Sequence, residues 1–498
     1  MIRAVLLLLY PTTLFAQDLL VLAPEEFQPA LTAWRAHREE QGHTVAVRVP
    51  EQDPVAQVRR VHKSAGGALK YVLLLGDVNR IACTYSPGES IKLWERDPRI
   101  ANDNQLADLD GDGLPDLAVG RLPADDVAEA TAMVGKIVAY EKNRDFSTWR
   151  RRLNMVAGVG GFGMWADWAL EQATIAVARD VVPPAYDVHA TYANPRSSFC
   201  PPPARVAETT LERLNEGALL VAYFGHGSRR RLDRLRFRGE SHAIFTEDHA
   251  YELKARRGAP IVFFCACSTG HMDGAPDSLA ELVIKQPAGP VAVYAASRVS
   301  MPYANGMFSK ELIQAIFSAE TVGEALQEAK RRLMADDQWD NTRRTIETYG
   351  FAYKTAKERR SERAEHLYLY NLFGDPAMRI PRAAPVEVRV GPEEIAPGGR
   401  LKIMGRTEVA GEVLVELVAE RTPVVPLRVG DDDAAFAETY ARANARTRAS
   451  AKTTVDQGKF AAELTVPEDV NPGRYYVRVY VTGAGGAALG ARLIEVKR

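Results

Sequence analysis

Two short apolar runs, each followed at once by a small cluster of polar residues, constrain the fold of this chain most strongly. Residues 218–224 (ALLVAYF) are followed by the sequence GHGS, and residues 261–266 (IVFFCA) are followed by CSTG. Runs of β-branched and aromatic residues at this length are typical of strands that are buried on both faces, as in a mostly parallel sheet. Because ligands of such sheets bind beyond the carboxyl ends of the strands, we expect His226 and Cys267 to meet at one site.

The segments around these runs predict an α/β architecture in two parts. Strand-like and helix-like stretches alternate through residues 17–145, an N-terminal α/β subdomain, and the alternation restarts over residues 146–380, a catalytic α/β subdomain. We therefore expect an open sheet with helices on its faces. Residues 386–498 change character to alternating strands separated by turns, which predicts a β-sandwich of immunoglobulin-like size. Within it, Asp431–Lys452 is expected to be a helical or mobile insertion.

Composition and charge limit the classes of partner. The chain has 498 residues with 63 Lys and Arg against 64 Asp and Glu, so its net charge is −1. This balance gives no reason to expect nucleic acid or anionic lipid as a partner. Residues 1–16 combine one basic residue, an apolar core and a terminal small residue, which predicts a signal peptide. We expect a soluble protein that is secreted, periplasmic or at the cell surface, without stable membrane insertion, and the sequence indicates no oligomeric state.

Cys267 and His226 together suggest nucleophilic catalysis. A thiol is a weak nucleophile until it becomes a thiolate, and an adjacent imidazole favours that form. The amides of Gly227 and Cys267 are candidates for an oxyanion hole, which requires hydrogen-bond donors fixed in advance. The alternative is a buried structural cysteine and a surface histidine, but the position of both residues at strand ends favours catalysis.

The remaining cysteines allow other interpretations. Cys265, Cys267, His271 and His226 include good Zn²⁺ ligands, but alternation along a strand directs Cys265 and Cys267 to opposite faces, which disfavours a shared metal. Cys265 is instead expected to be a small buried side chain. Two further cysteines lie in loop-like sequence and are expected either to form a disulfide or to be free: Cys83 and Cys200.

An acidic loop at residues 108–116 (DLDGDGLPD) predicts a cation site. Its carboxylates recur at alternate positions, the glycines allow a tight wrap, and the spacing resembles the first nine positions of an EF-hand loop without its distal glutamate. The candidate ligands of a structural Ca²⁺ are Asp108, Asp110, Asp112 and Asp116. The alternative is a solvated acidic turn, which mutual repulsion of the carboxylates disfavours.

Several motifs in the same order resemble the gingipain-type cysteine peptidases of family C25, which have a caspase-like fold. Besides GHG and the Ala-Cys at the end of the next run, the resemblance includes residues 71–77 (YVLLLGD), 119–123 (VGRLP), 295–297 (AAS) and 372–376 (LFGDP). It covers roughly residues 17–380, and a following β-sandwich also fits the architecture of that family. The resemblance therefore implies a caspase-like α/β sheet for this region.

The same resemblance assigns roles to residues. It implies that Cys267 is the nucleophile, that His226 is the base or acid, that Asp167 is an acid selecting basic substrate residues, and that Tyr303 forms a pocket wall. Asp167 could instead cap a helix. The resembling peptidases also have a glutamate that assists the histidine, whereas residues 158–161 (GVGG) contain no acid here. Either the dyad works alone or another carboxylate serves.

The function expected from these observations is an exported cysteine endopeptidase that hydrolyses protein or peptide substrates, with cleavage after Arg or Lys. One alternative is a sortase-like transpeptidase of surface proteins, and another is a non-catalytic adhesion or scaffold protein with the same fold. An arginine cluster after GHGS is expected either to bind an acidic substrate or to form a solvated loop; its members are Arg229, Arg230, Arg231, Arg234, Arg236 and Arg238.

Overall fold

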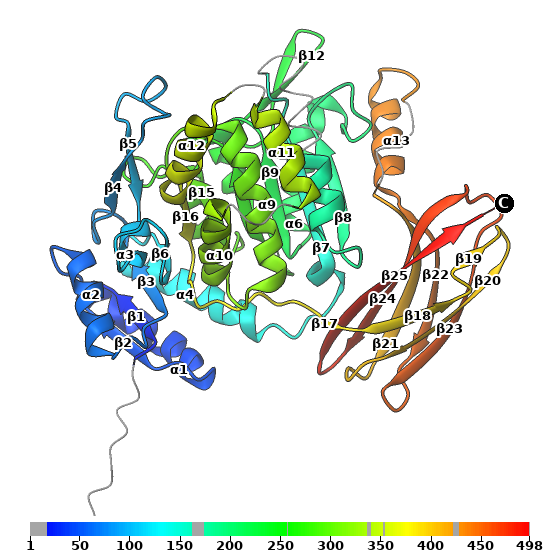
Figure 1. The fold of residues 1–498 in the computed structure, drawn as a ribbon, viewed down its shortest axis with the longest axis horizontal. Coiled ribbons are helices and arrows are strands. Elements are labelled where there is room, and N and C mark those ends of the chain that lie inside the picture. The colour runs from blue at the N-terminus through cyan, green and yellow to red at the C-terminus, as the bar shows by residue number, and fades with distance from the viewer. Residues whose placement is uncertain are drawn as a thin grey trace, which may run out of the picture.

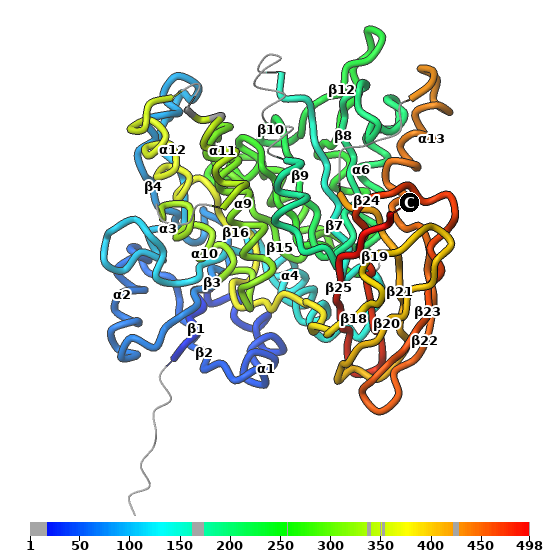
Figure 2. The backbone as a smooth tube through the Cα atoms, turned by 45° about the vertical axis from the view of Figure 1, so that its right-hand side comes forward, coloured from blue at the N-terminus to red at the C-terminus, as the bar shows by residue number. Residues whose placement is uncertain are grey.

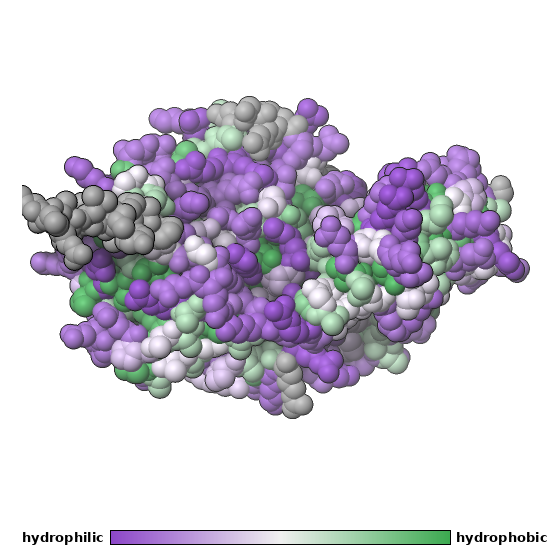
Figure 3. Space-filling model, turned by 90° about the horizontal axis from the view of Figure 1, so that it is seen from below, coloured by the Kyte–Doolittle hydropathy of each residue, from purple (hydrophilic) through white to green (hydrophobic). Residues whose placement is uncertain are grey.

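The computed structural model describes residues 17–161, 174–255, 257–335, 340–351, 354–421 and 428–497. A large α/β region is followed by a C-terminal region made almost wholly of strands, and the two lie side by side (Figure 1). Seen from below, the C-terminal region is the smaller lobe at the right, and this side of the molecule is mostly hydrophilic with scattered apolar residues (Figure 3). Within the described residues, none of the helices combines the length and apolar character needed to cross a membrane.

One ten-stranded sheet forms the centre of the α/β region, with the strand order β2-β1-β3-β6-β16-β15-β14-β9-β7-β8. Its strands are β1 (Leu19–Leu22), β2 (Val45–Arg48), β3 (Tyr71–Leu75), β6 (Ala118–Leu122), β7 (Arg152–Ala157), β8 (Asp187–Tyr192), β9 (Leu220–Phe224), β14 (Ile261–Cys265), β15 (Ala292–Ala296) and β16 (Tyr370–Phe373). The predicted open α/β sheet is confirmed.

The sheet consists of two parallel halves that run in opposite directions. The strands from β2 to β16 are parallel to one another, and so are those from β15 to β8, whereas β15 and β16 pair antiparallel. The carboxyl ends of β14 and β9 therefore lie at the same edge as the amino end of β6. That arrangement places residues 108–116, which precede β6, on the same side of the sheet as His226 and Cys267.

Helices cover both faces of this sheet. In Figure 1 the last four helices of the region lie in front of β15 and β16. The helices are α1 (Thr32–Glu40), α2 (Pro54–Ser64), α3 (Asn104–Ala107), α4 (Val127–Lys142), α6 (Val206–Asn215), α7 (Glu247–Ala250), α8 (Leu279–Lys285), α9 (Pro302–Ser318), α10 (Val322–Met334), α11 (Asn341–Phe351) and α12 (Ala356–Leu369). Shorter helical turns are η1 (Glu25–Leu31), η2 (Thr148–Arg151), η3 (Val177–Val181) and η4 (Pro203–Arg205).

The apolar runs form strands because both of their faces are buried. In β1, Leu19 and Val21 belong to one hydrophobic cluster while Leu20 and Leu22 belong to another, on opposite sides of the sheet. β9 and β14 are likewise buried along almost their whole length. Continuous apolar sequence, rather than alternation, is what such a doubly covered parallel sheet requires.

Three small hairpins extend from the sheet on the side of the site. They are formed by β4 (Thr84–Pro87) with β5 (Arg99–Asn102), β10 (Gly227–Ser228) with β11 (Arg231–Leu232), and β12 (Arg234–Phe237) with β13 (Glu240–Ala243).

The C-terminal region consists of two sheets that share one hydrophobic core. The first contains β17 (Ala384–Pro385), β19 (Glu394–Ile395), β21 (Glu412–Ala419), β22 (Thr447–Thr454), β24 (Gly473–Gly483) and β25 (Gly486–Val496), and the second contains β18 (Glu387–Gly391), β20 (Arg400–Arg406) and β23 (Lys459–Thr465). Buried and exposed positions alternate in β20, as a sheet with one solvated face requires. Its immunoglobulin-like character stays a prediction.

The predicted insertion Asp431–Lys452 is only partly right. Residues Asp433–Asn444 form the helix α13, but from Thr447 the chain already belongs to strand β22. This strand is mostly exposed and carries small or polar side chains, so it lacks the apolar alternation that reveals a strand in sequence.

Buried contacts join the C-terminal region to the α/β region. Arg151 donates from Nη1 to Oε2 of Glu416 at 2.6 Å, and Arg478 pairs with both Glu416 and Asp187. Arg421 donates to four backbone carbonyls of residues 178–186. α13 lies beside β8 in Figure 2, where Asn444 bonds both backbone groups of Ala190.

Candidate active site

The strand register brings the histidine and cysteine loops together. β9 and β14 are adjacent and parallel, and Phe224 is paired with Cys265 at their carboxyl ends. The next residue, Gly225, donates its N–H to the carbonyl of Cys265 at 3.3 Å. His226 and Cys267 thus leave the sheet at neighbouring points, as the sequence predicted.

Cys267 lies on a sharp turn. Ser268, the residue that follows it, has a φ of 55°, a left-handed conformation that is uncommon outside glycine. The N–H of Ser268 is held by the carbonyl of Arg298 at 2.9 Å, and Gly270 donates to Ala296 at 2.9 Å. These bonds tie the turn to the end of β15 and fix the direction of the Cys267 side chain.

Ser300 places two hydrogen-bond donors near the Cys267 thiol. Its N–H lies 3.4 Å from Sγ and its hydroxyl lies 3.9 Å from Sγ. Burial raises the pKa of Cys267 above its ordinary value, while both hydrogen bonds from Ser300 act to lower it. The carboxylate of Glu95 also raises this pKa; it reaches the site by accepting the N–H of Val299 at 2.9 Å.

The imidazole of His226 points toward the loop after β7. Its Nε2 forms a short hydrogen bond with the carbonyl of Gly160. Tyr223, buried in β9, donates its hydroxyl to the backbone carbonyl of His226 at 2.8 Å. The imidazole thus bonds to the loop after β7, whereas the Cys267 thiol bonds to Ser300 in the loop after β15.

Gly227 forms the contact between the two loops. A Cβ at this position would lie 2.7 Å from the Cβ of Ala266 and 2.9 Å from the carbonyl oxygen of Cys267. Such distances are below those of ordinary contacts, so only glycine lets the His226 loop pack directly on the Cys267 turn. The N–H of Cys267 itself donates to no carbonyl among the described residues.

The two residues assigned to a substrate pocket have different outcomes. Asp167 lies outside the described residues. Tyr303 is the second residue of α9 and lies three residues after Ser300. It is partly buried and donates its hydroxyl to Oε1 of Glu347 at 2.6 Å. Burial and the Glu347 carboxylate raise the pKa of Tyr303 above its ordinary value. Its ring therefore packs toward α11 close to the site, and its role as a pocket wall stays a prediction.

Cys265 is buried on the opposite side of the strand from Cys267. Its Sγ accepts a hydrogen bond from Ser309 at 3.1 Å, and burial raises its pKa to about 11. Within the described ranges, the one converging group of three or more candidate metal ligands consists of aspartates alone. The Zn²⁺ alternative therefore finds no support here. Cys83 and Cys200 are both free, so they form no disulfide.

The acidic loop brings together three of the four predicted ligands. Carboxylate oxygens of Asp108, Asp110 and Asp116 all lie within 4.8 Å of one another. Asp112 is outside this group, and its Oδ1 accepts the N–H of Leu114 at 2.7 Å. Gly111 and Gly113 have φ values of 87° and 88°, which produce the expected tight wrap.

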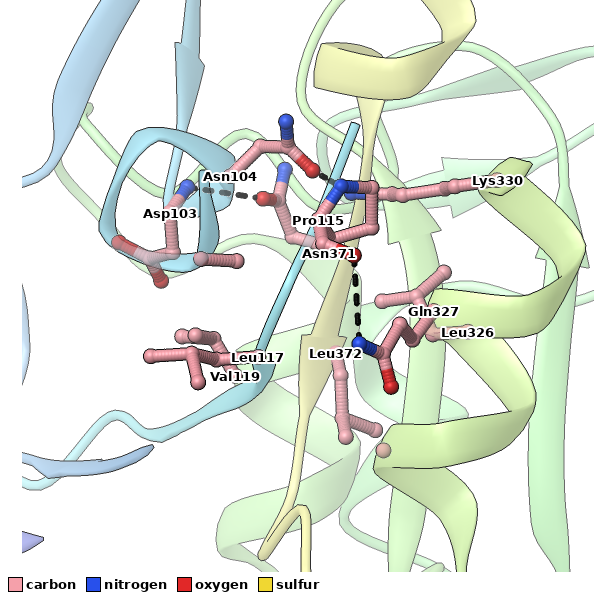
Figure 4. A pocket seen from close by; sticks show the side chains of 12 residues that line it. Asp103, Asn104, Pro115, Leu117, Val119, Leu326, Gln327, Lys330, Asn371 and Leu372 are labelled. Atoms are coloured by element: carbon pink, nitrogen blue, oxygen red, sulfur yellow. Dashed lines mark hydrogen bonds between the residues drawn. The ribbon is translucent and has the colours of Figure 1, made fainter. Parts of the chain in front are cut away.

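Helix α10 holds the end of this loop. Gln327 donates to the carbonyl of Pro115 at 3.2 Å, and the buried Lys330 donates to Oδ1 of Asn104 at 2.9 Å (Figure 4). Arg331 adds an ion pair with Asp116 at 3.1 Å. Three converging carboxylates with a rigid backbone fit the oxygen donor set of Ca²⁺, although Arg331 already neutralises part of the charge.

Three members of the arginine cluster line an open cavity of about 430 Å³, whose lining residues are Ser228, Arg229, Arg230, Arg231, Thr246, Glu247 and Asp248. Arg230 forms an ion pair with Glu247. Arg234 donates to Ser241, and Arg238 lies over the Phe237 ring. These contacts favour the interpretation as a solvated, internally paired loop.

Comparison with known proteins gives the family. The sequence pattern of peptidase family C25 matches residues 12–381. Gingipain R2 of Porphyromonas gingivalis is 22% identical over 342 residues, which cover 67% of this chain and 40% of that protein. Gingipain R1 of the same species is 21% identical over 342 residues, with 67% and 30% covered. The chain thus spans less than half the length of these curated relatives.

The fold agrees with that assignment. The crystal structure of the Arg-specific cysteine proteinase gingipain R matches with a TM-score of 0.55 at 15% identity, over 97% of this chain and 98% of that one. This likeness extends the fold match across nearly the whole chain. The caspase-like architecture of the core is thereby confirmed, and the chain belongs to peptidase family C25.

Proposed function

We propose that this protein is a cysteine endopeptidase in which Cys267 is the nucleophile and His226 the general acid. The observation that carries the proposal is the packing of Gly227 on the Cys267 turn, which makes one surface from two separate strand ends. Membership of family C25 and the fold of gingipain R support it. The hydrogen bonds from Ser300 to the partly buried Cys267 thiol also favour it.

In the proposed reaction, the thiol proton of Cys267 passes to His226, and Sγ attacks the carbonyl carbon of the scissile peptide bond. The oxygen, which becomes negatively charged, is stabilised by the amides of Gly227 and Cys267. His226 gives its proton to the departing amine as the C–N bond breaks, leaving a thioester on Cys267. Water then attacks the thioester, so that the carboxylic acid leaves and the thiol is regenerated.

A covalent probe tests this assignment. An electrophilic peptide ketone should label the purified protein at Cys267, as located by peptide mass mapping, and the labelled fraction should rise in step with the loss of peptidase activity. Labelling at Cys265, or full activity after complete modification of Cys267, would contradict the proposal. Addition of amines separates hydrolysis from acyl transfer, since a transpeptidase would give amide products.

Substrate preference for basic residues is proposed on a narrower basis. Gingipain R is described as Arg specific, Asp167 falls where a pocket acid is expected, and the partly buried Glu95 adds negative charge beside Cys267. Arg suits such carboxylates through paired hydrogen bonds. Cleavage of a peptide library should show Arg, then Lys, before the cut, and a profile without basic preference would refute this part alone.

Two further assignments belong to the same proposal. Ca²⁺ would be held by Asp108, Asp110 and Asp116 and would fix the loop before β6.

Export is proposed from the apolar character of residues 1–16. Amino-terminal sequencing of the mature protein should begin within a few residues of Gln17, and an intact Met1 in the mature protein would contradict it.

A further inference from the structure

The register of a small hairpin places an acidic residue opposite the proposed catalytic histidine. β10 and β11 pair antiparallel, with Gly227 opposite Leu232 and Ser228 opposite Arg231. Continued by one residue, this register sets His226 opposite Asp233. Residues directly opposite each other in an antiparallel pair project to the same face, with Cβ atoms about 4.5–5.5 Å apart.

A buried tyrosine fastens the backbones of these two residues to each other. The hydroxyl of Tyr223 donates to the carbonyl of His226 at 2.8 Å and accepts the N–H of Asp233 at 3.2 Å. The carbonyl of Asp233 in turn accepts the N–H of Ile244 at 2.9 Å. Asp233 is therefore fixed relative to His226 by bonds that do not involve its own side chain.

One oxygen of the Asp233 carboxylate keeps acceptor capacity, because the described hydrogen bond to this side chain ends on the other oxygen. Its Oδ1 accepts the N–H of Arg234 at 2.7 Å. Its Oδ2 lies over Gly158, 3.2 Å from the point that a Cβ there would occupy, and no described hydrogen bond ends on it. Burial raises the pKa of Asp233, whereas the charges of His226 and Arg236 lower it, so the carboxylate and a protonated His226 attract each other.

Gly158 leaves the space that this arrangement needs. A Cβ at Gly158 would also lie 3.0 Å from the Tyr223 hydroxyl, so a side chain there would displace Asp233 or Tyr223. An acidic side chain at residue 158 would therefore compete with Asp233 for the same space.

We propose that Asp233 is a positioning residue that orients His226 and stabilises its imidazolium while it protonates the leaving amine. The proposal rests on the peptidase function proposed above. A carboxylate that pairs with a histidine in this way fixes the ring and favours its charged form. Removing the charge should weaken proton delivery without changing substrate binding.

Asp233→Asn tests the proposal because it keeps the shape and the acceptor for Arg234 N–H but loses the charge. We expect kcat to fall by roughly 10- to 100-fold with KM changed less than about threefold, since general acid catalysis contributes 10²–10⁴. The pH at which kcat/KM falls on the alkaline side should move lower. Asp233→Glu, which restores the charge, should recover part of both effects.

Glu240→Gln is the matched control, because it removes an exposed carboxylate from the adjacent β12–β13 hairpin. Its kcat and pH profile should equal those of the wild-type protein. If Asp233→Asn matches Glu240→Gln in kcat and in pH profile, the proposal is wrong. If the melting curve shows that Asp233→Asn does not fold, Asp233→Glu is compared with Asp233→Ala instead. A difference between these two variants in kcat and in the alkaline limb of the pH profile supports the proposal. Identical kcat values and pH profiles refute it.

A separate readout distinguishes this failure from failure of the proposed function. The rate at which iodoacetamide alkylates Cys267 reports its thiolate form, whether or not the protein cleaves peptides. An unmodified protein without peptidase activity would refute the proposed function. The inference on Asp233 would still be judged by whether Asp233→Asn, and not Glu240→Gln, changes the pH dependence of that alkylation.

Discussion

The two polar clusters at the same edge of the sheet are built in opposite ways. The Cys267 site joins residues from β9, β14 and the loop after β15, and its geometry depends on strand pairing across the whole second half of the sheet. The acidic loop is made within residues 108–116 by bonds between near neighbours, such as Gly113 N–H to Asp108 at 2.9 Å.

Because of this difference, mutations in the Cys267 site should affect mainly activity, and mutations in the acidic loop should affect mainly stability. A site assembled from distant strands exists only when the core is folded, so changing its reactive atoms should alter chemistry and leave the core unaffected. A local loop gains its order from its own turns and from a ligand, so changing it should alter stability under conditions that depend on that ligand. The predictions below test this separation, beginning with the largest effect.

The largest effect is expected at Cys267. Cys267→Ala should lower peptidase activity by at least about a thousandfold because the nucleophile is lost, while the unfolding free energy changes by less than about 1 kcal/mol. Cys265→Ala should retain activity within about threefold and lose about 1 kcal/mol of stability, since it removes the buried partner of Ser309. Kinetic assays and denaturant unfolding of both variants would expose a reversed pattern, which would make Cys265 the nucleophile.

A smaller loss of activity is expected at Gly227. Gly227→Ala places a methyl group 2.7 Å from Ala266 and should push the two loops apart, lowering kcat/KM by roughly 10²-fold, the order expected for a shift of about 1 Å. Gly135→Ala in α4 has open space around it and serves as the control. Equal kcat/KM in both variants would show that the loop contact is not required.

The acidic loop should change stability rather than chemistry. Ca²⁺ at 100 times its dissociation constant should raise the unfolding free energy by about 2.7 kcal/mol, measured as a higher Tm than in chelator. Asp110→Ala should abolish the rise, whereas Asp112→Ala should keep most of it because Asp112 lies outside the converging group. Melting curves that coincide in chelator and in excess Ca²⁺ would exclude the site.

The smallest effect is expected at Arg331. This side chain is half exposed and pairs with Asp116, so Arg331→Gln should change stability in chelator by no more than about 1 kcal/mol. Because Asp116 loses its positive neighbour, Ca²⁺ should bind severalfold more tightly, as titration calorimetry can measure. Weaker binding in this variant would mean that Arg331 orients Asp116 for the cation.

The sequence predicted those parts of the fold that depend on burial. β9 and β14 are recognisable because both faces of each strand are covered, and their order in an α/β pattern places His226 and Cys267 at strand ends. Strand β22 escaped prediction because it is largely exposed and so carries no apolar alternation.

At the site, sequence spacing indicates which residues leave the sheet but not which distant loops surround them. Ser300 and Glu95 approach Cys267 from two loops that are distant from it in the sequence. Only the folded chain shows that these residues lie near the thiol. The spacing of the four aspartates likewise does not show which of them converge, and only the folded loop leaves Asp112 outside the group.

Asn444, at the end of α13, has a consequence for solubility. Its side-chain amide accepts the N–H of Ala190 at 2.9 Å and donates to the carbonyl of the same residue at 3.0 Å, as a neighbouring strand would. β8 is the last strand of the ten-stranded sheet, and an unpaired last strand is a template for aggregation. The C-terminal region thus covers part of the edge strand β8. In a chain shortened to the α/β region, we expect β8 to be exposed to pairing with other copies of the chain.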